Sequence, residues 1–249
     1  MKVAVCISGV CSSTNPLTSL QRNNQRLKEK FTGYDFYYST YESFRPVFEK
    51  NFPDYDCKYF AEPEVKYHPY IDVPPEHHVS HYFTERVRWA NTLPPQKKAW
   101  TTHHTKQILA HSWLLDSIDK DYDVIVRARF DGFVHKKANF MPYIKDAYDN
   151  GTVHGFAVTR KNMFHEFYDS PMEKGSKHEV YMLDQMIIHR RDRLDTSMVY
   201  KLDEEKKLHA AEFGWYQVLS HPWGGVHKNH HGFINHDKNV LDEYLMDLK

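Results

Sequence analysis

The sequence predicts an α/β fold in which helices flank a central and mostly parallel sheet. The chain opens with strand and helix patterns that alternate, in the order β-α-β-α-β. Such an alternation is typical of parallel strands joined by right-handed helical crossovers. Further along, the apolar run from Val124 to Val126 has the short, β-branched character of a strand buried on both faces, as in the middle of such a sheet.

Periodicity and capping residues predict the first elements in order. Lys2 to Ser8 is expected to form a strand that stops at Ser8-Gly9. Asn15-Pro16 then resembles an N-cap followed by proline at the first helical position, and Gly33 ends that helix. A strand, a short helix and another strand follow, at Asp35 to Thr40, Tyr41 to Lys50 and Tyr55 to Phe60.

The regular pattern dissolves from Ala61 to Gln96, where prolines, histidines and tyrosines dominate. We expect a long loop excursion at about residues 61–98, and loops of this length are usually functional. Helical periodicity returns from Ala99 to Ile118 and leads into the strand that follows Asp123.

The remaining elements alternate between strands and helices. They are expected near Phe133 (strand), at Phe140 to Tyr148 (helix), Val153 to Val158 (strand), Met182 to His189 (apolar segment), and Arg191 to Tyr200 and Ala210 to Leu219 (helices). We find no internal repeat and no low-complexity linker, so we expect one domain over residues 1–249.

Composition narrows the class of protein. Acidic and basic residues balance at 33 each, which argues against a nucleic-acid partner. The apolar run at the N-terminus is too short for a signal peptide, and we find no run near the roughly 20 apolar residues that a transmembrane helix needs. The three cysteines, Cys6, Cys11 and Cys57, are odd in number and not spaced like a metal site, which favours the reducing cytoplasm.

The most informative segment is Asp121 to Asp131, because charged residues follow its apolar core. Ligands of α/β sheets bind outside the carboxyl ends of the strands, where Arg127, Arg129 and Asp131 are expected to lie. Two guanidinium groups suit a phosphorylated ligand, and Asp131 is a candidate ligand for a divalent cation. The alternative is a strand that ends in a solvated salt-bridge cluster.

Three segments carry recognisable motifs: the first strand ends in Ile-Ser-Gly, the segment YDFYYSTY follows, and a long helix leads to YDVIVRARFD with its Arg-x-Arg-x-Asp signature. Together these segments resemble the GT-A-fold (Rossmann-like) glycosyltransferases, and most closely the WavE-like lipopolysaccharide-synthesis group of bacteria and their viruses. Asp184-Gln185 and Glu212 match later positions of the group. The resemblance covers most of the chain except Ala61 to Gln96.

The resemblance implies transfer of a sugar from a nucleotide-sugar donor to a hydroxyl of a glycan or polysaccharide. Ser8, Gly9 and Val10 match the loop that lies against the nucleotide, and a glycine allows close approach of the backbone. In GT-A enzymes a DxD motif holds a divalent cation, Mn or Mg, that bridges the donor diphosphate. Here Arg129 replaces the first acid. Either Asp131 with a later ligand holds the metal, or the charges of Arg127 and Arg129 substitute for it.

Further residues match the acceptor side and a metal site. Sugar transfer needs a base for the acceptor hydroxyl, and Asp184 and Glu212 are the candidates, Asp184 ranked slightly first. Each has a structural alternative: Asp184 as a buried, paired acid, and Glu212 as a residue that stabilises the first turn of its helix. By the same resemblance, His227 or His230 is a candidate additional metal ligand; a polar surface loop is the alternative.

Two other classes of function remain compatible with the sequence. A metal-dependent hydrolase would use Asp131, Asp184 and the C-terminal histidines, although no His-x-Asp motif is present. A non-catalytic protein that binds a nucleotide or glycan would explain the incomplete DxD motif and the aromatic content of 15%. The sequence indicates no oligomeric state, donor sugar, nucleotide base or stereochemical outcome.

Overall fold

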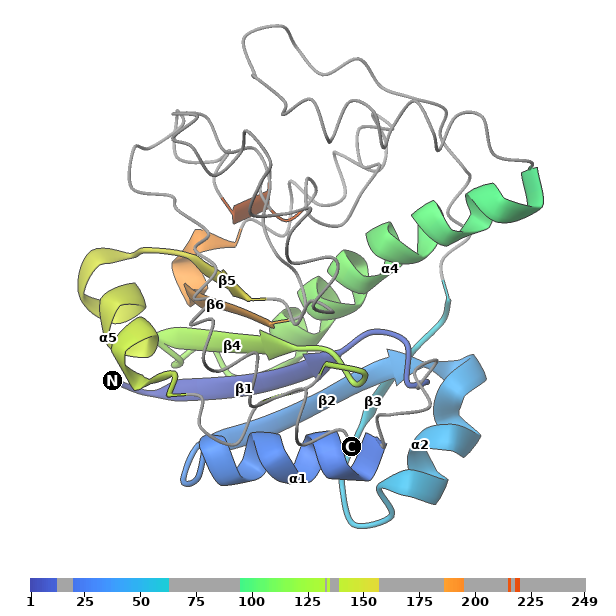
Figure 1. Ribbon diagram of the computed structural model, residues 1–249, viewed down its shortest axis with the longest axis horizontal. Coiled ribbons are helices and arrows are strands. Elements are labelled where there is room, and N and C mark those ends of the chain that lie inside the picture. Colours follow the sequence, from blue (N-terminus) through green and yellow to red (C-terminus); the bar gives the residue numbers. More distant parts are fainter. Residues whose placement is uncertain are drawn as a thin grey trace, which may run out of the picture.

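A six-stranded mixed sheet forms the centre of the computed structural model, with the strand order β3-β2-β1-β4-β6-β5 (Figure 1). The structure describes residues 1–12, 20–62, 95–132, 134, 139–156, 186–194, 215 and 218–219, and of 95–105 only the backbone. The strands are β1 (Val3–Ser8), β2 (Asp35–Tyr41), β3 (Lys58–Phe60), β4 (Val124–Ala128), β5 (His154–Phe156) and β6 (Met186–Arg190). The four strands β1 to β4 are parallel, whereas β6 is antiparallel to both β4 and β5.

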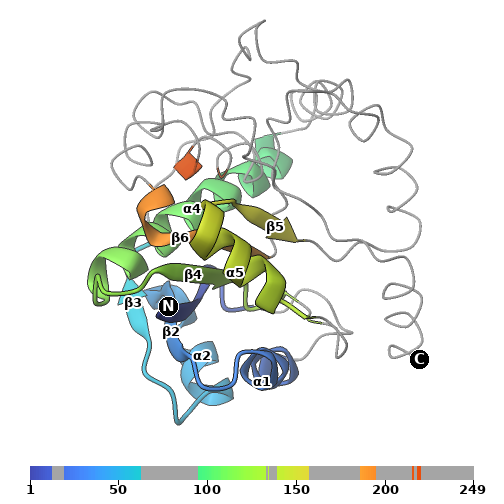
Figure 2. The same cartoon turned by 90° about the vertical axis from the view of Figure 1, so that its left-hand side faces the viewer.

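Helices cover both faces of this sheet, as Figures 1 and 2 show. One face packs against α1 (Leu20–Lys30), α2 (Arg45–Asn51) and α5 (Met141–Asn150). The long helix α4 (Pro95–Ser117) covers the other face. Side chains of a strand alternate between faces, so Val124, Val126 and Ala128 belong to the first core and Ile125 to the second.

The predicted class, a mostly parallel α/β sheet flanked by helices, is confirmed. Some boundaries were wrong: β3 has three residues instead of six, and α4 begins at Pro95, earlier than the predicted Ala99 and inside the expected excursion. Proline is tolerated in the first turn of a helix, where its missing N–H has no intrahelical acceptor.

The last elements also differ from the sequence prediction. The helix predicted from Arg191 is a 3-10 turn, η2 (Arg191–Arg193), with Leu194 extended, and residues 195–200 lie outside the described part. Within the predicted helix from Ala210 to Leu219, residues 215, 218 and 219 are described and helical. Most of the 61–98 excursion and the strand predicted near Phe133 fall on residues that the structure does not describe.

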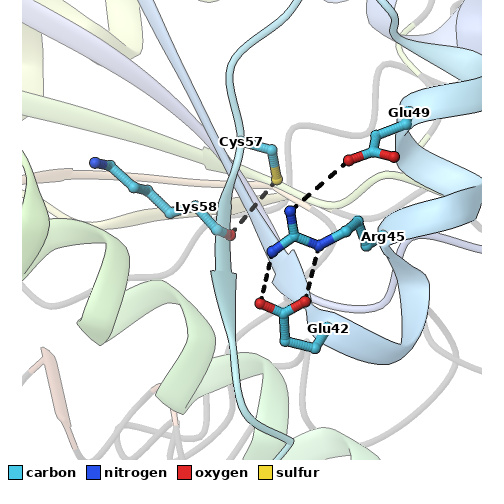
Figure 3. A network of polar contacts seen from close by, with 5 residues as sticks. All are labelled: Glu42, Arg45, Glu49, Cys57 and Lys58. Atoms are coloured by element: carbon cyan, nitrogen blue, oxygen red, sulfur yellow. Dashed lines mark hydrogen bonds and ion pairs between the residues drawn. The ribbon is translucent and has the colours of Figure 1, made fainter.

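The outer edge of the sheet is attached through Arg45 in α2, which follows the 3-10 turn η1 (Glu42–Phe44). Its guanidinium donates to both carboxylate oxygens of Glu42 at 2.8 and 2.7 Å and lies 3.8 Å from Glu49 (Figure 3). It also lies over the Tyr59 ring of β3, 3.9 Å from the ring centroid. These groups are half-exposed, so the contacts orient α2 against β3 more than they stabilise the fold.

The parallel strands β1 to β4 all end at the same edge of the sheet, which we call the carboxyl edge. Because β6 is antiparallel, it begins there: Met186 pairs with Ala128, the last residue of β4. Phe156, the last residue of β5, also pairs with Met186, so the carboxyl edge collects the ends of β1 to β5 and the start of β6. Among the helices that the structure describes, none has the length and apolar character to cross a membrane.

Candidate functional site

The chain turns sharply at the end of β1, over the end of β2. Gly9 has a φ of 113°, a conformation that residues with a Cβ rarely adopt. Its N–H donates to the Ser39 carbonyl at 3.2 Å, and its carbonyl accepts the Thr40 hydroxyl at 2.8 Å. Two hydrogen bonds to β2 thus fix the backbone of this turn, to which Ser8, Gly9 and Val10 contribute. Ser8 is buried and Val10 is half-buried.

One face of α4 holds the ends of three strands at the carboxyl edge. The Tyr41 hydroxyl donates to the Lys106 carbonyl and the Ser39 hydroxyl to the Ala110 carbonyl, the latter at 3.3 Å. Successive turns of a helix place residues three and four apart on one face, so these contacts form a row along α4. Together with two contacts to β1 and β4, this row ties the ends of three strands to one rigid helix.

The two other contacts of this row involve side chains of α4. Gln107 accepts a hydrogen bond from Arg127 of β4 through its amide oxygen. His111 lies with its Nδ1 3.5 Å from the Ser8 hydroxyl of β1. Sequence reasoning missed both α4 residues. The signal was a pair of polar residues four apart on the buried side of a helix, a spacing that places them one above the other.

At the outer end of the same row, Lys106 joins α4 to the segment after β3. Its Nζ lies 2.9 Å from a carboxylate oxygen of Glu62, whose other oxygen accepts the Ser43 hydroxyl at 3.3 Å. The Lys106 side chain is only 13% exposed. This ion pair is partly shielded from water, and it joins α4 to the segment that follows β3 at the carboxyl edge.

Arg127 is fully buried, and its guanidinium points toward α4 and away from Ala128, whose side chain is in the opposite core. The guanidinium carbon lies 5.0 Å from the centroid of the Trp215 ring, within the range of a cation–π interaction. A buried charge that is hydrogen-bonded and stacked in this way orders its surroundings. These contacts hold the Arg127 side chain, and with it the end of β4, against α4 and Trp215.

Arg129 and Asp131 form a bidentate ion pair immediately after β4. Nε and Nη2 of Arg129 each donate to one oxygen of the Asp131 carboxylate, both at 2.8 Å. The two side chains are 33% and 27% exposed, so the pair is reachable from solvent. The carboxylate that the sequence marked as a candidate metal ligand thus already has a guanidinium on both of its oxygens.

Two buried imidazoles lie between α4 and the sheet. The rings of His111 and His189 are 6.0 Å apart, and Trp215 lies 5.4 Å from His111. Burial lowers the pKa of His111 well below its usual value, helped by the positive charges of Arg127 and Arg191. Burial likewise lowers the pKa of His189 to about 4, so both rings are neutral at pH 7.

The ring nitrogens of this cluster are not all satisfied. Nδ1 of His189 is 2.7 Å from the Arg190 carbonyl, which only accepts, so Nδ1 carries the proton. Within the part of the chain that the structure describes, the Nε2 atoms of His111 and His189 and Nε1 of Trp215 have no hydrogen-bond partner. A buried nitrogen that finds no partner costs about 1–3 kcal/mol.

Four of the candidate site residues cannot be compared with the structure. Asp184 and Glu212, the candidate bases, and His227 and His230, the candidate metal ligands, lie outside the described residues. Asp184 precedes Met186 by two positions, and Met186 begins β6 at the carboxyl edge. The described residues, taken alone, contain no group of three or more His, Cys, Asp and Glu that could hold a metal ion.

A groove of about 760 Å³ opens at the other end of β4, where the strand begins. It is lined by Lys120, Tyr122, Asp123, Tyr148, Asp149, Arg190, Arg191 and Asp192. Its arginines are engaged within the protein: Arg190 donates to Asp192, and Arg191 to the carbonyls of Asp119 and Leu115. The residues that the sequence singles out, from Ser8 to Val10 and from Arg127 to Asp131, lie at the opposite, carboxyl edge, and we take that edge as the candidate site.

Comparison with known proteins yields fold similarity only. No protein-family model matches the chain, and no curated protein matches it. The structure of 4-diphosphocytidyl-2C-methyl-D-erythritol synthase from Anaerococcus prevotii aligns over 98% of both chains with 8% identity and a TM-score of 0.43. Mouse xyloside xylosyltransferase 1 aligns over 88% of this chain and 80% of its own, with 12% identity and a TM-score of 0.38. At these values neither similarity identifies the function of the chain.

Proposed function

We propose that this protein is a glycosyltransferase that moves a sugar from a nucleotide-sugar donor to a hydroxyl of a glycan or polysaccharide. The donor lies against the carboxyl edge of the sheet, with its nucleotide along the turn at Ser8 and Gly9. Its diphosphate faces Arg129 and Asp131 at the end of β4.

The observation that carries this proposal is the neighbouring position of two strand ends. β1 and β4 are adjacent and parallel, and Ile7 pairs with Ala128. The turn at Gly9 and the Arg129–Asp131 pair therefore follow directly from paired positions at the same edge. The glycine in this turn lets a ligand approach the backbone, and an accessible guanidinium lies beside it. A nucleoside diphosphate needs both features, a backbone surface and a positive charge.

The first experiment measures donor binding and donor turnover. A panel of nucleotide-sugars is screened by thermal shift; a donor at about 100 times its dissociation constant stabilises the fold by about 2.7 kcal/mol. Hydrolysis or transfer of the bound donor then identifies an enzyme, whereas binding without turnover identifies a nucleotide-binding protein. If no nucleotide-sugar shifts the transition, the proposal fails.

Asp131→Asn tests the diphosphate end of the site. The variant is expected to fold, because the Arg129–Asp131 pair is partly exposed and its loss costs little stability. It should lose most donor turnover, since Arg129 is no longer held by a carboxylate. Circular dichroism and turnover on the same preparation measure both effects, and wild-type turnover would remove Asp131 from the site.

Asp184→Asn and Glu212→Gln test the acceptor side. A base is needed only as the acceptor hydroxyl attacks, so Asp184→Asn should abolish transfer and leave donor affinity nearly intact. Glu212→Gln should cause a milder loss. The reverse ranking would make Glu212 the base, and loss of donor affinity in Asp184→Asn would assign that residue to the donor site instead.

A further inference from the structure

Building on the proposed function, we propose that the positive charge that stabilises the donor diphosphate is Arg129, held in place by Asp131, and that the site binds a diphosphate without a divalent cation. Asp131 is then a positioning residue, and the ligand recognised at the end of β4 is the diphosphate group itself.

The geometry of the Arg129–Asp131 pair does not fit a metal on Asp131. Each carboxylate oxygen accepts one N–H of Arg129 at 2.8 Å. A divalent cation would coordinate the same oxygens at about 2.0–2.6 Å and would lie beside a guanidinium of like charge. A metal could use only the lone pairs that this ion pair leaves, and the like charge of the guanidinium beside it lowers its affinity.

The same geometry suits an anion. A guanidinium has five N–H donors in a rigid plane, so an arginine oriented by one carboxylate can donate to phosphate oxygens at the same time. Asp131 immobilises that plane through a bidentate contact, which lowers the entropy lost when an anion binds. Arg127, fully buried two residues earlier, adds a positive charge that solvent screens poorly.

The reaction needs a positive charge beside the leaving group, which is the diphosphate. During transfer, the bond between the anomeric carbon and the β-phosphate oxygen breaks, and its electron pair stays on the diphosphate. The acceptor oxygen forms a new bond to that carbon, and its proton passes to the base. N–H groups that already point toward the diphosphate before the reaction stabilise the negative charge as it develops there. Arg129 is in the position to supply them.

The experiment titrates inorganic pyrophosphate into the protein by calorimetry, once with excess EDTA and once with Mn²⁺. We expect that Mn²⁺ does not raise the affinity, and that it lowers the apparent affinity only to the extent that it complexes free pyrophosphate. Arg129→Lys should lower the affinity on the order of tenfold, because lysine keeps the charge but loses the bidentate fork. In Asp131→Asn, pyrophosphate binding should weaken and stay independent of Mn²⁺.

Arg190→Lys is the matched control. Arg190 donates to Asp192 with the same two-residue spacing and through the same Nε and Nη2 atoms, but at the opposite edge of the sheet. Its substitution should leave pyrophosphate affinity unchanged. An equal loss in both lysine variants would overturn the assignment to Arg129.

The outcomes separate this inference from the proposed function. Pyrophosphate binding that requires Mn²⁺, and that Asp131→Asn abolishes, would overturn the metal-free site and leave the glycosyltransferase proposal standing. Binding of neither pyrophosphate nor any nucleotide-sugar, with or without Mn²⁺, would overturn both.

Discussion

Two arginines two residues apart have different environments at the end of β4. Arg127 is fully buried against Gln107 and Trp215, while Arg129 is one-third exposed and bound to Asp131. The first is the last arginine within the strand and the second lies just past its end. Their different burial predicts different consequences for the same substitution.

Arg127→Lys should reduce stability, whereas Arg129→Lys should reduce anion affinity. Lysine at position 127 loses the fork that donates to Gln107 and the flat contact with Trp215, at a cost of about 2 kcal/mol. At position 129 the cost to stability should stay below about 1 kcal/mol, because the ion pair there is partly exposed. Urea denaturation of the two variants measures the difference, and equal midpoints would contradict it.

At the scale of elements, α4 determines the shape of the carboxyl edge. It reaches the ends of β1, β2 and β4 through residues 106 to 111, within two turns of one helix. The periodicity of this helix was visible in the sequence, but its role was not. Contacts such as that of Gln107 with Arg127 join residues 20 positions apart, and no local pattern encodes such pairs.

The turn after α1 contains Gly33, whose backbone conformation predicts the cost of a substitution. Gly33 has a φ of 84°, and a Cβ added to it would meet nothing within 4 Å. Gly33→Ala therefore costs only the backbone strain, about 1 kcal/mol, without a steric clash. Gly33→Asn should cost less, because asparagine tolerates the left-handed region better. Thermal unfolding compares the variants, and an alanine variant as stable as wild type would contradict the strain.

At the scale of the whole molecule, sequence reasoning succeeded where a signal was local and periodic. The apolar strand from Val124 to Val126, the end of the first helix near Gly33 and the opening β-α-β-α-β order are such signals, and the structure contains all three. The pairing of β6 antiparallel to β4, between Met186 and Ala128, has no local signature. It joins residues that are far apart in the sequence.

The candidate site was predictable to a smaller extent. The sequence located Arg127, Arg129 and Asp131 at a strand end but did not tell which arginine reaches the ligand and which is structural. Burial separates them, and burial depends on α4 and Trp215, which are far from β4 in sequence. The histidines show the same effect: 18 are present, and sequence alone did not distinguish His111 and His189 as core residues.

These two histidines predict how the stability of the whole fold depends on pH. In the unfolded chain a histidine has a pKa near 6.5, whereas burial lowers the pKa of His189 to about 4 and that of His111 further below its usual value. Above pH 6.5 the two rings are neutral in the folded and in the unfolded chain, so their titration does not change the free energy of unfolding. As the pH falls toward 4, the unfolded state binds protons that the folded state does not, so stability is lost.

For His189 the separation of the two pKa values corresponds to about 3 kcal/mol by pH 4, on an order-of-magnitude basis. The groups that face the pair, Arg127 and Arg191, are positive and oppose protonation of His111. His189→Gln removes the titrating ring and should flatten the decline of the unfolding free energy between pH 6.5 and 4. His154→Gln is the comparison, since Asp146 at 2.8 Å partly offsets the burial that lowers the pKa of His154. Urea midpoints at several pH values would test this, and parallel curves for wild type and His189→Gln would mean that His189 binds its proton equally in both states.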